Sequence, residues 1–378
     1  MKRLITTPRP NWQQIVESQG LNYHTDALGN AYWNESAYYQ FSMEQIEHVE
    51  RVTNNLHGMC LEAVQHVIDK KRYRELQIPD IAVPLIEHSW NNETAAIYGR
   101  FDLRYDGYSE PKLLEYNADT PTSLVEAGVV QWYWMEEKFK GADQFNSIHD
   151  RLVAKWKELK DYIPGTLYLT HMDSWEDYMT TVYMADTAHQ AGFLTKVVPI
   201  EEIGWDSKTK QFVDPEMNTM RSIFKLYPWE WMLKDEYGQH ILTSINDTTW
   251  IEPPWKMVLS NKGILPILWE LYPNHPNLLP AYFEPSKLEW YAKKPLYSRE
   301  GANITLCTDL ETIEEAGGKY GEEGYIYQDL AVLPKLDGNY PMIGSWVVDG
   351  EAAGMGIRES STLITGNLSR FVPHIIQG

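Results

Sequence analysis

Apolar residues recur at helical spacing in the segment from Asn34 to Lys71. Intervals of three and four residues place side chains on one face of a helix, which covers a core while the other face meets solvent. We therefore expect one or two scaffold helices here. The apolar positions are Tyr39, Met43, Ile46, Val49, Val52, Leu56, Cys60 and Val64.

Short apolar runs broken by turn residues replace this pattern from Ile81 to Gly128. Three of them predict strands: an apolar stretch that ends at Ile86, then TAAIYGRFDLRYDG, then KLLEYNADTP. Helical spacing returns from Val129 to Ile163. The first strands of a sheet are therefore expected before residue 128.

The segment from Thr166 to Val198 predicts a strand, a helix and a second strand. Its three parts are TLYLTHMD, SWEDYMTTVYMADTAHQAG and FLTKVVPI. In such βαβ units, ligands bind outside the carboxyl ends of the strands. The loop from His171 to Asp177 is therefore expected to lie at a ligand crevice.

The remaining chain alternates short strands with proline and glycine turns. Short strands are expected between Trp205 and Pro228. A stretch rich in Trp and Pro follows, in which Pro253 marks a candidate linker or domain seam. From Tyr291 to Arg358 the pattern predicts a compact antiparallel α+β subdomain.

Length and charge narrow the possible classes of protein. A chain of 378 residues exceeds the size of one hydrophobic core, so two or three subdomains are expected. The formal charge of -20 opposes binding to nucleic acid, which demands clustered Lys and Arg. The acidity suits a cationic substrate such as a polyamine, but an ordinary acidic surface explains it equally well.

Targeting signals and cysteine frameworks are not evident in the sequence. No run of about 18 apolar residues occurs, and the first residues, MKRLITTPRPNWQQ, lack the apolar core of a secretory signal. Cys60 and Cys307 are the two cysteines, and their spacing suggests neither a disulfide framework nor a zinc site. We expect a cytoplasmic protein that does not associate with membranes.

Three residues on two predicted strands form a candidate site for a hard cation. Asp102 lies in one strand, and Glu115 and Asn117 lie two apart in the next, so the last two face the same side. Magnesium prefers such oxygen ligands together with phosphate oxygens. The alternative is an exposed polar strand face, with Asp102 paired to Arg100.

The loop ADTPTS follows Asn117 directly and offers hydroxyl and backbone N–H groups to an anion. Thr120, Thr122 and Ser123 are therefore candidate substrate contacts. The alternative is that they cap a helix. In that case Ser123 and Glu126 form a capping box, and the helix begins at Leu124.

Four segments together resemble the synthetase domain of glutathionylspermidine synthase: GRFD, LLEYNADTPTSLVEA, KPLYSREGAN and GIRESSTLITGNLSRFVPH. The similarity extends from about Trp33 to His374 and is closest to stand-alone bacterial relatives. It implies a mixed α/β (α+β) chain with a permuted ATP-grasp fold. Residues 1–205 are then expected to hold the metal-binding strands and a pre-ATP-grasp βαβ unit, and residues 206–378 the nucleotide-binding region, with interleaved subdomains.

The resemblance also implies roles for individual residues. Asp102, Glu115 and Asn117 would hold Mg²⁺ on bound ATP, and Arg100 and Arg358 would act in catalysis on the transferred phosphoryl group. Lys294 would contact the phosphates together with Lys262, for which Lys256 is the alternative. Further nucleotide contacts are implied for Arg100, Phe101, Asp102, Glu300, Gly301, Gln328, Asp329, Leu330, Ala331, Leu363, Ile364 and Thr365. Substrate contacts are implied for Thr120, Thr122, Glu176 and Asp177.

The implied activity is an ATP- and magnesium-dependent ligase that joins a carboxylate to an amine through an acyl phosphate. The partners would be a small-molecule or peptide carboxylate and an amine, including a polyamine. Around Trp229 and Glu230 the sequence YPWEWMLKDE departs from the synthase, so glutathione and spermidine are not carried over. The alternatives are a true glutathionylspermidine synthetase, or a module that binds and hydrolyses ATP without ligase activity.

Overall fold

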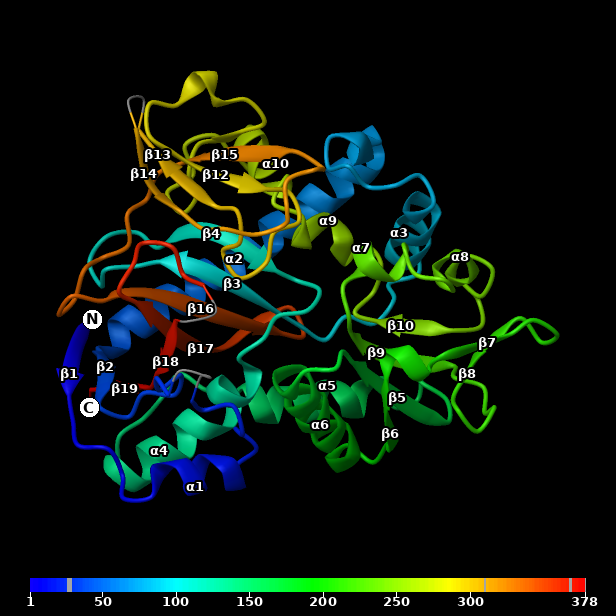
Figure 1. Ribbon diagram of the computed structural model, residues 1–378, viewed down its shortest axis with the longest axis horizontal. Coiled ribbons are helices and arrows are strands. Elements are labelled where there is room, and N and C mark those ends of the chain that lie inside the picture. The colour runs from blue at the N-terminus through cyan, green and yellow to red at the C-terminus, as the bar shows by residue number, and fades with distance from the viewer. Residues whose placement is uncertain (26–28, 309–310, 367–368, 378) are drawn as a thin grey trace.

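Figure 1 shows the computed structural model of the chain, which describes residues 1–25, 29–308, 311–366 and 369–377. Two antiparallel sheets, one above the other in this view, adjoin a parallel sheet at the lower right. This mixed α/β architecture is the expected fold class. Within the described residues, no helix is long and apolar enough to cross a membrane.

The central sheet joins strands from the two ends of the chain. Its strand order is β18-β17-β16-β3-β4, with all neighbours antiparallel. The strands are β3 (Tyr98–Arg104), β4 (Lys112–Asn117), β16 (Tyr340–Val348), β17 (Glu351–Ser360) and β18 (Arg370–Val372). Helix α2 (Met43–Lys70) packs against β16 and β17 with the apolar stripe predicted from its spacing.

A second antiparallel sheet lies beside the central one (Figure 1). Its order is β11-β15-β12-β13-β14, and helix α10 (Ile264–Leu271) packs on β11 and β15. The strands are β11 (Ala281–Tyr282), β12 (Tyr291–Pro295), β13 (Thr305–Cys307), β14 (Thr312–Glu315) and β15 (Tyr325–Asp329).

The predicted βαβ unit is confirmed as β5 (Thr166–His171), α6 (Trp175–Gln190) and β6 (Leu194–Pro199). It belongs to a four-stranded parallel sheet of order β10-β9-β5-β6, which also contains β9 (Ser222–Leu226) and β10 (Thr249–Ile251). Strands from both sides of residue 205 thus share this sheet. The division of the chain at that residue stays a prediction.

A small sheet brings the two ends of the chain together. Strand β2 (Ala37–Phe41) pairs with β1 (Lys2–Ile5) on one side and β19 (His374–Ile376) on the other. Strands β7 (Gly204–Asp206) and β8 (Gln211–Val213) form a hairpin. The other helices and turns are α1 (Trp12–Ser18), η1 (Arg72–Arg74), α3 (Ala82–Asn91), η2 (Glu126–Val130), α4 (Gln131–Lys138), α5 (Ile148–Leu159), η3 (Ile200–Glu202), α7 (Trp229–Met232), α8 (Gly238–Ile241), α9 (Lys256–Ser260) and η4 (Pro285–Lys287).

One predicted helix begins later than expected, and one predicted strand is a helix. The expected helix from Asn34 begins only at Met43, where Ser42 and Gln45 form a capping box. Before it, β2 buries alternate residues because its partners come from the distant ends of the chain. The apolar stretch up to Ile86 belongs to α3, since a short apolar run does not distinguish a buried strand from a helix.

The expected subdomain from Tyr291 to Arg358 is divided between the two antiparallel sheets. Strands β16 and β17 join β3, more than 200 residues earlier, rather than β12 to β15. Pro253 is buried between β10 and α9, inside the packed core. The Ser123–Glu126 capping box does not form: helical structure does begin at Leu124, but both side chains bond to Tyr32.

Candidate active site

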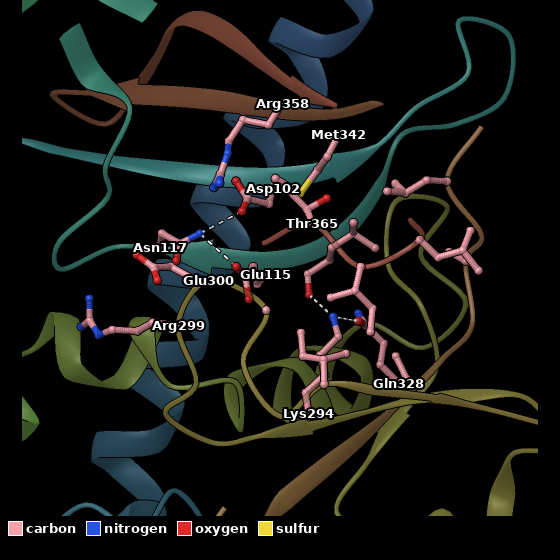
Figure 2. A pocket seen from close by; sticks show the side chains of 18 of the residues that line it. Asp102, Glu115, Asn117, Lys294, Arg299, Glu300, Gln328, Met342, Arg358 and Thr365 are labelled. Atoms are coloured by element: carbon pink, nitrogen blue, oxygen red, sulfur yellow. Dashed lines mark hydrogen bonds between the residues drawn. The ribbon is translucent and has the colours of Figure 1, made fainter. Parts of the chain in front are cut away.

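A cavity lies between the two antiparallel sheets. Its lining comes from the loop after β4, from β12 and β15 of the second sheet, and from β3, β16 and β17 of the central sheet. Most of the residues expected to contact nucleotide, metal or substrate line this one cavity. Figure 2 shows their side chains converging on it.

The predicted oxygen ligands meet at one wall of the cavity. Register places Asp102 opposite Glu115 on the paired strands β3 and β4, and Asn117 follows on the same face. Asn117 Nδ2 lies 3.1 Å from Asp102 Oδ2 and 3.2 Å from Glu115 Oε1 (Figure 2). Two carboxylates and an amide fit Mg²⁺ when phosphate oxygens complete its shell. Within the described residues, no group of three His, Cys, Asp or Glu side chains forms a metal site by itself.

Two arginines border these oxygen ligands, of which Arg100 is buried and Arg358 is half-buried. Arg100 forms a two-pronged ion pair with Asp102, at 2.7 Å and 3.1 Å, and donates to the carbonyl oxygen of Thr122 at 2.5 Å. Arg358, which belongs to β17, lies near Asp102 (Figure 2). Its Nη2 donates to Gly366 O at 2.7 Å. Its Nε is buried and has no protein partner within the described chain, so a bound anion would satisfy it.

Of the three candidate lysines, two reach the site. Lys294 lines the cavity and donates to Leu114 O at 2.8 Å and Gln328 Oε1 at 2.7 Å. Lys262 lies behind Glu115, with its Nζ 3.0 Å from Oε2 of that carboxylate. Lys256 instead forms a buried ion pair with Glu252, away from the cavity. The geometry therefore favours Lys262 over Lys256.

The lysines control the ionisation of Glu115. Burial by itself would raise the pKa of this carboxyl, but the Lys262 and Lys294 ammonium groups outweigh it and lower the pKa to about 2. Burial also lowers the pKa of Lys294 to about 8, against the opposing effect of Glu115. For Asp102, burial raises the pKa despite the neighbouring Arg100. The wall thus keeps Glu115 anionic and ready for a cation.

The opposite end of the cavity is apolar and suits a flat ring. Ala292, Leu306 and Ile364 form a small cluster there, with Leu330 and Leu363 packed against it. The predicted strand-edge residues Gln328, Asp329, Leu330 and Ala331, and the predicted segment Leu363, Ile364 and Thr365, all line this cavity. A nucleotide has an anionic end, which suits the wall with Arg100 and Arg358, and a flat ring, which suits the apolar end.

The predicted loop at Glu300 and Gly301 borders the cavity. Gly301 has a φ of 72°, and a Cβ added there would lie 2.5 Å from the carbonyl oxygen of Thr365. Both conditions require glycine. This close contact joins two segments that the sequence analysis had assigned to nucleotide binding separately.

Four predicted site residues do not line the cavity within the described chain. Phe101 is fully buried and stacks on Tyr116 with ring centroids 3.8 Å apart, so its contribution is to packing. Lys262 acts through Glu115. Glu176 and Asp177 begin α6 beside the cavity, and Glu176 shares a side-chain hydrogen bond with Thr122. Thr120 and Thr122 are lining residues, as expected.

Arg299 is a lining residue that the sequence analysis missed. Its Nη1 donates to Thr120 Oγ1 at 2.5 Å, its Nη2 lies 3.3 Å from Glu230 Oε1, and its buried Nε has no partner within the described chain. The signal was its place in KPLYSREGAN, beside Glu300. Pairing with Glu230 could not be read from sequence, because the two are 69 residues apart. Other missed lining residues are Leu114, Pro121, Ala292, Ile304, Leu306, Val332, Leu333 and Met342.

Comparison with known proteins agrees with this arrangement. The model of the glutathionylspermidine synthase preATP-grasp family matches residues 3–377. The chain belongs to this family. A relative from Haemophilus influenzae that bears the name acid–amine ligase is 44% identical, with 99% of each chain covered. Membership in this family places the chain among carbon–nitrogen ligases.

Other family relatives are longer than this chain. The bifunctional glutathionylspermidine synthetase/amidase of Escherichia coli is 30% identical over 93% of this chain and 62% of its own length. Trypanothione synthetase of Crithidia fasciculata is 29% identical over 97% of this chain and 61% of its own. The chain thus spans about three fifths of these two proteins. A solved glutathione synthetase-like effector from Globodera pallida shares the fold, with a TM-score of 0.56, 11% identity, and 98% and 100% of the two chains covered.

Proposed function

We propose that the protein is an ATP- and Mg²⁺-dependent ligase that joins a carboxylate to an amine through an acyl phosphate. The observation that carries this proposal is the single cavity in which Asp102, Glu115 and Asn117 face Arg100 and Arg358. Family membership supports the use of ATP and the formation of a C–N bond.

The magnesium site would consist of Asp102, Glu115 and Asn117 together with phosphate oxygens of ATP. Bound there, the ion supplies charge neutralisation on the transferred phosphoryl group. Lys262 and Lys294 keep Glu115 ionised, which this role requires. Lys294 also presents a cation to the phosphates from the second sheet.

The reaction needs no protein nucleophile. A carboxylate oxygen of the acid attacks the terminal phosphorus of ATP, and ADP leaves with the electrons of the broken P–O bond. The neutral amine then attacks the carbonyl carbon, phosphate leaves, and the amine nitrogen gives up a proton to form the amide. Arg100 and Arg358 stabilise the negative charge that develops in both steps, because their guanidinium groups are fixed beside the place where that charge forms.

The acid and the amine are unassigned in this proposal. Two relatives are named for glutathionylspermidine, but the Glu230 carboxylate here neutralises Arg299 at the edge of the cavity. A substrate carboxylate approaching Arg299 would have to compete with Glu230. Because the sequence around Trp229 and Glu230 departs from that of the synthase, we favour an acid that differs from glutathione over strict glutathionylspermidine synthesis.

The proposal is tested by measuring ADP release with purified protein, ATP and Mg²⁺ across a panel of acid and amine pairs that includes glutathione with spermidine. A productive pair should raise ADP release only when both members are present, and mass spectrometry should detect the new amide. With ¹⁸O in the acid carboxylate, one ¹⁸O should appear in phosphate, as an acyl phosphate requires.

The alternatives give different results in the same assay. Activity with glutathione and spermidine above all other pairs would identify a true glutathionylspermidine synthetase. ATP turnover that no pair increases, although ADP binds normally, would favour a nucleotide-binding module without ligase activity. Amide formation with AMP in place of ADP would contradict the acyl phosphate.

A further inference from the structure

A second cavity lies outside the carboxyl ends of the parallel sheet and has no lining residue in common with the candidate active site. Its volume is about 360 Å³, within the range of small-ligand sites. Met172 directly follows β5, Ile200 directly follows β6 and Tyr227 directly follows β9, and all three line it. We name it the carboxyl-edge pocket.

Its position is the one at which open α/β sheets bind ligands. The chain passes from β5 outward to β6 and later places β9 on the other side of β5, so the strand order reverses between β5 and β9. A crevice forms at such a reversal, outside the carboxyl ends of the strands. Met172 and Tyr227 lie at the ends of these two strands. The sequence predicts a ligand crevice at the loop from His171 to Asp177, and Met172 of that loop lines the carboxyl-edge pocket.

The interior of the carboxyl-edge pocket is apolar and aromatic. Phe212, Ile241 and Trp250 are buried lining residues, and Phe212 and Trp250 meet edge to face with ring centroids 5.2 Å apart. Trp250 is 5% exposed, and its indole Nε1 is buried without a hydrogen-bond partner in the part of the chain described here. An unpaired buried N–H is unfavourable, and an acceptor atom on a ligand would satisfy it.

The mouth of the pocket carries negative charge. Glu201, Asp235 and Glu236 are exposed lining residues. The Tyr227 hydroxyl donates to the Asp235 carboxylate, and burial, this bond and the nearby Glu201 carboxylate raise the pKa of Tyr227. The neighbouring Lys234 is directed to Glu323, with 3.5 Å between the charged atoms. The mouth therefore attracts a cation, and aromatic rings add to that attraction.

We propose that the carboxyl-edge pocket binds an amphipathic amine: its ammonium group lies at the acidic mouth, its apolar or aromatic body lies on Phe212 and Ile241, and an acceptor atom at its far end takes the Trp250 indole N–H. The site is separate from the nucleotide cavity, and the inference does not depend on the ligase activity. The segment from Tyr227 to Asp235 contributes to both cavities: its ends line the carboxyl-edge pocket, and Glu230 within it pairs with Arg299.

Tyramine is the probe for this site, since it joins an ammonium group, an aromatic ring and a phenolic acceptor. Titration calorimetry on the full chain should give saturable binding of tyramine. Phenethylamine, which lacks the phenol oxygen, should bind about five-fold more weakly, in keeping with one hydrogen bond. 3-(4-Hydroxyphenyl)propionate, which has a carboxylate in place of the ammonium group, should not bind.

Two exposed residues allow a test that leaves the core unchanged. The double variant Glu201→Gln/Glu236→Gln should weaken tyramine binding about five-fold, and added salt should reduce the difference. Glu202→Gln, an exposed neighbour of Glu201 that does not line the pocket, should bind tyramine as the wild type does. Saturating ADP should leave tyramine affinity unchanged.

Three results would overturn the proposal. They are an absence of saturable tyramine binding up to about 1 mM, an equal loss in Glu202→Gln, and displacement of tyramine by ADP. Trp250→Phe should abolish the preference for tyramine over phenethylamine, and a thermal melt reports whether this variant is folded. If it is not folded, the unsubstituted protein and its two exposed-residue variants still decide the matter.

Discussion

Lys294 and Gln328 join the two antiparallel sheets at the floor of the candidate active site. Lys294 Nζ donates to Gln328 Oε1 at 2.7 Å, and Gln328 Nε2 donates in turn to Leu113 O on β4 at 2.9 Å. Lys294 also donates to the next carbonyl of β4, that of Leu114, at 2.8 Å. The lysine that we assign to the phosphates therefore also links the two sheets on either side of the cavity.

We predict that Lys294→Met weakens ADP binding at least about ten-fold, because a buried cation facing the phosphates is lost. Lys293→Met is the matched control. Lys293 is the adjacent residue on β12 but lies over the Tyr325 ring at 4.0 Å and does not line the cavity. Calorimetry with ADP measures both. Equal losses in the two variants would mean that charge on this strand, and not contact with the nucleotide, sets the affinity.

The metal assignment predicts a different change. Asp102→Asn and Glu115→Gln should each lower Mg²⁺-dependent turnover at least about 100-fold, as removal of a preorganised charge typically does. Manganese binding followed by electron paramagnetic resonance should weaken in parallel in the presence of ADP. Glu110→Gln, whose carboxylate is 48% exposed on the β3–β4 hairpin, should keep wild-type values. Mg²⁺-dependent turnover that persists in Asp102→Asn would remove this residue from the metal set.

Local periodicity explains why the convergence of Asp102, Glu115 and Asn117 could be predicted from sequence. Glu115 and Asn117 share a face because side chains alternate along a strand, and the hairpin from β3 to β4 is short enough to pair them with Asp102. The apolar stripe of α2 was likewise a local pattern. In both cases the determining contacts are local.

Contacts between distant segments account for what the sequence did not indicate. Strand β2 was predicted as part of a helix. The strands that pair with it come from the two ends of the chain, so no local pattern indicates the pairing. The pairing of β16 with β3 divided a segment that had appeared to be one unit. Arg299 reaches Thr120 across 179 residues, so its place in the cavity depends on how two sheets pack and not on local spacing.

Replacing Lys256 or Lys262 by methionine should have different effects, the first on stability and the second on ADP binding. Removal of Lys256 leaves Glu252 buried without its cation, which should destabilise the fold by about 3–5 kcal/mol. Removal of Lys262 leaves Glu115 beside Asn117 and Lys294, so stability should change less while ADP binding weakens. Urea denaturation and ADP calorimetry separate the two effects. Normal ADP binding by Lys262→Met, with a loss in folded Lys256→Met, would reverse our assignment.

Glu126 should make stability depend on pH. Its carboxyl group is fully buried, accepts hydrogen bonds from Tyr32 and Tyr23, and has one oxygen without a partner among the described residues. Burial, helped by the nearby Glu176 carboxylate, raises its pKa to about 7. Its pKa in the unfolded chain is about 4.3. Between these values the folded protein holds a proton that the unfolded chain has lost.

The free energy of unfolding should therefore fall as pH rises from about 4 to about 7. At the higher pH the folded protein has to bury an ionised carboxylate, which is unfavourable. Glu126→Gln removes this titration and keeps an oxygen that accepts from Tyr32. The difference in free energy of unfolding between the variant and the wild type should shift by about 3 kcal/mol in favour of the variant between pH 4 and pH 8, from about 1.4 kcal/mol for each pKa unit. Urea denaturation at both pH values measures it. Glu136→Gln, exposed on α4, should follow the wild type, and a Glu126→Gln curve parallel to wild type would show that this carboxylate is not buried in charged form.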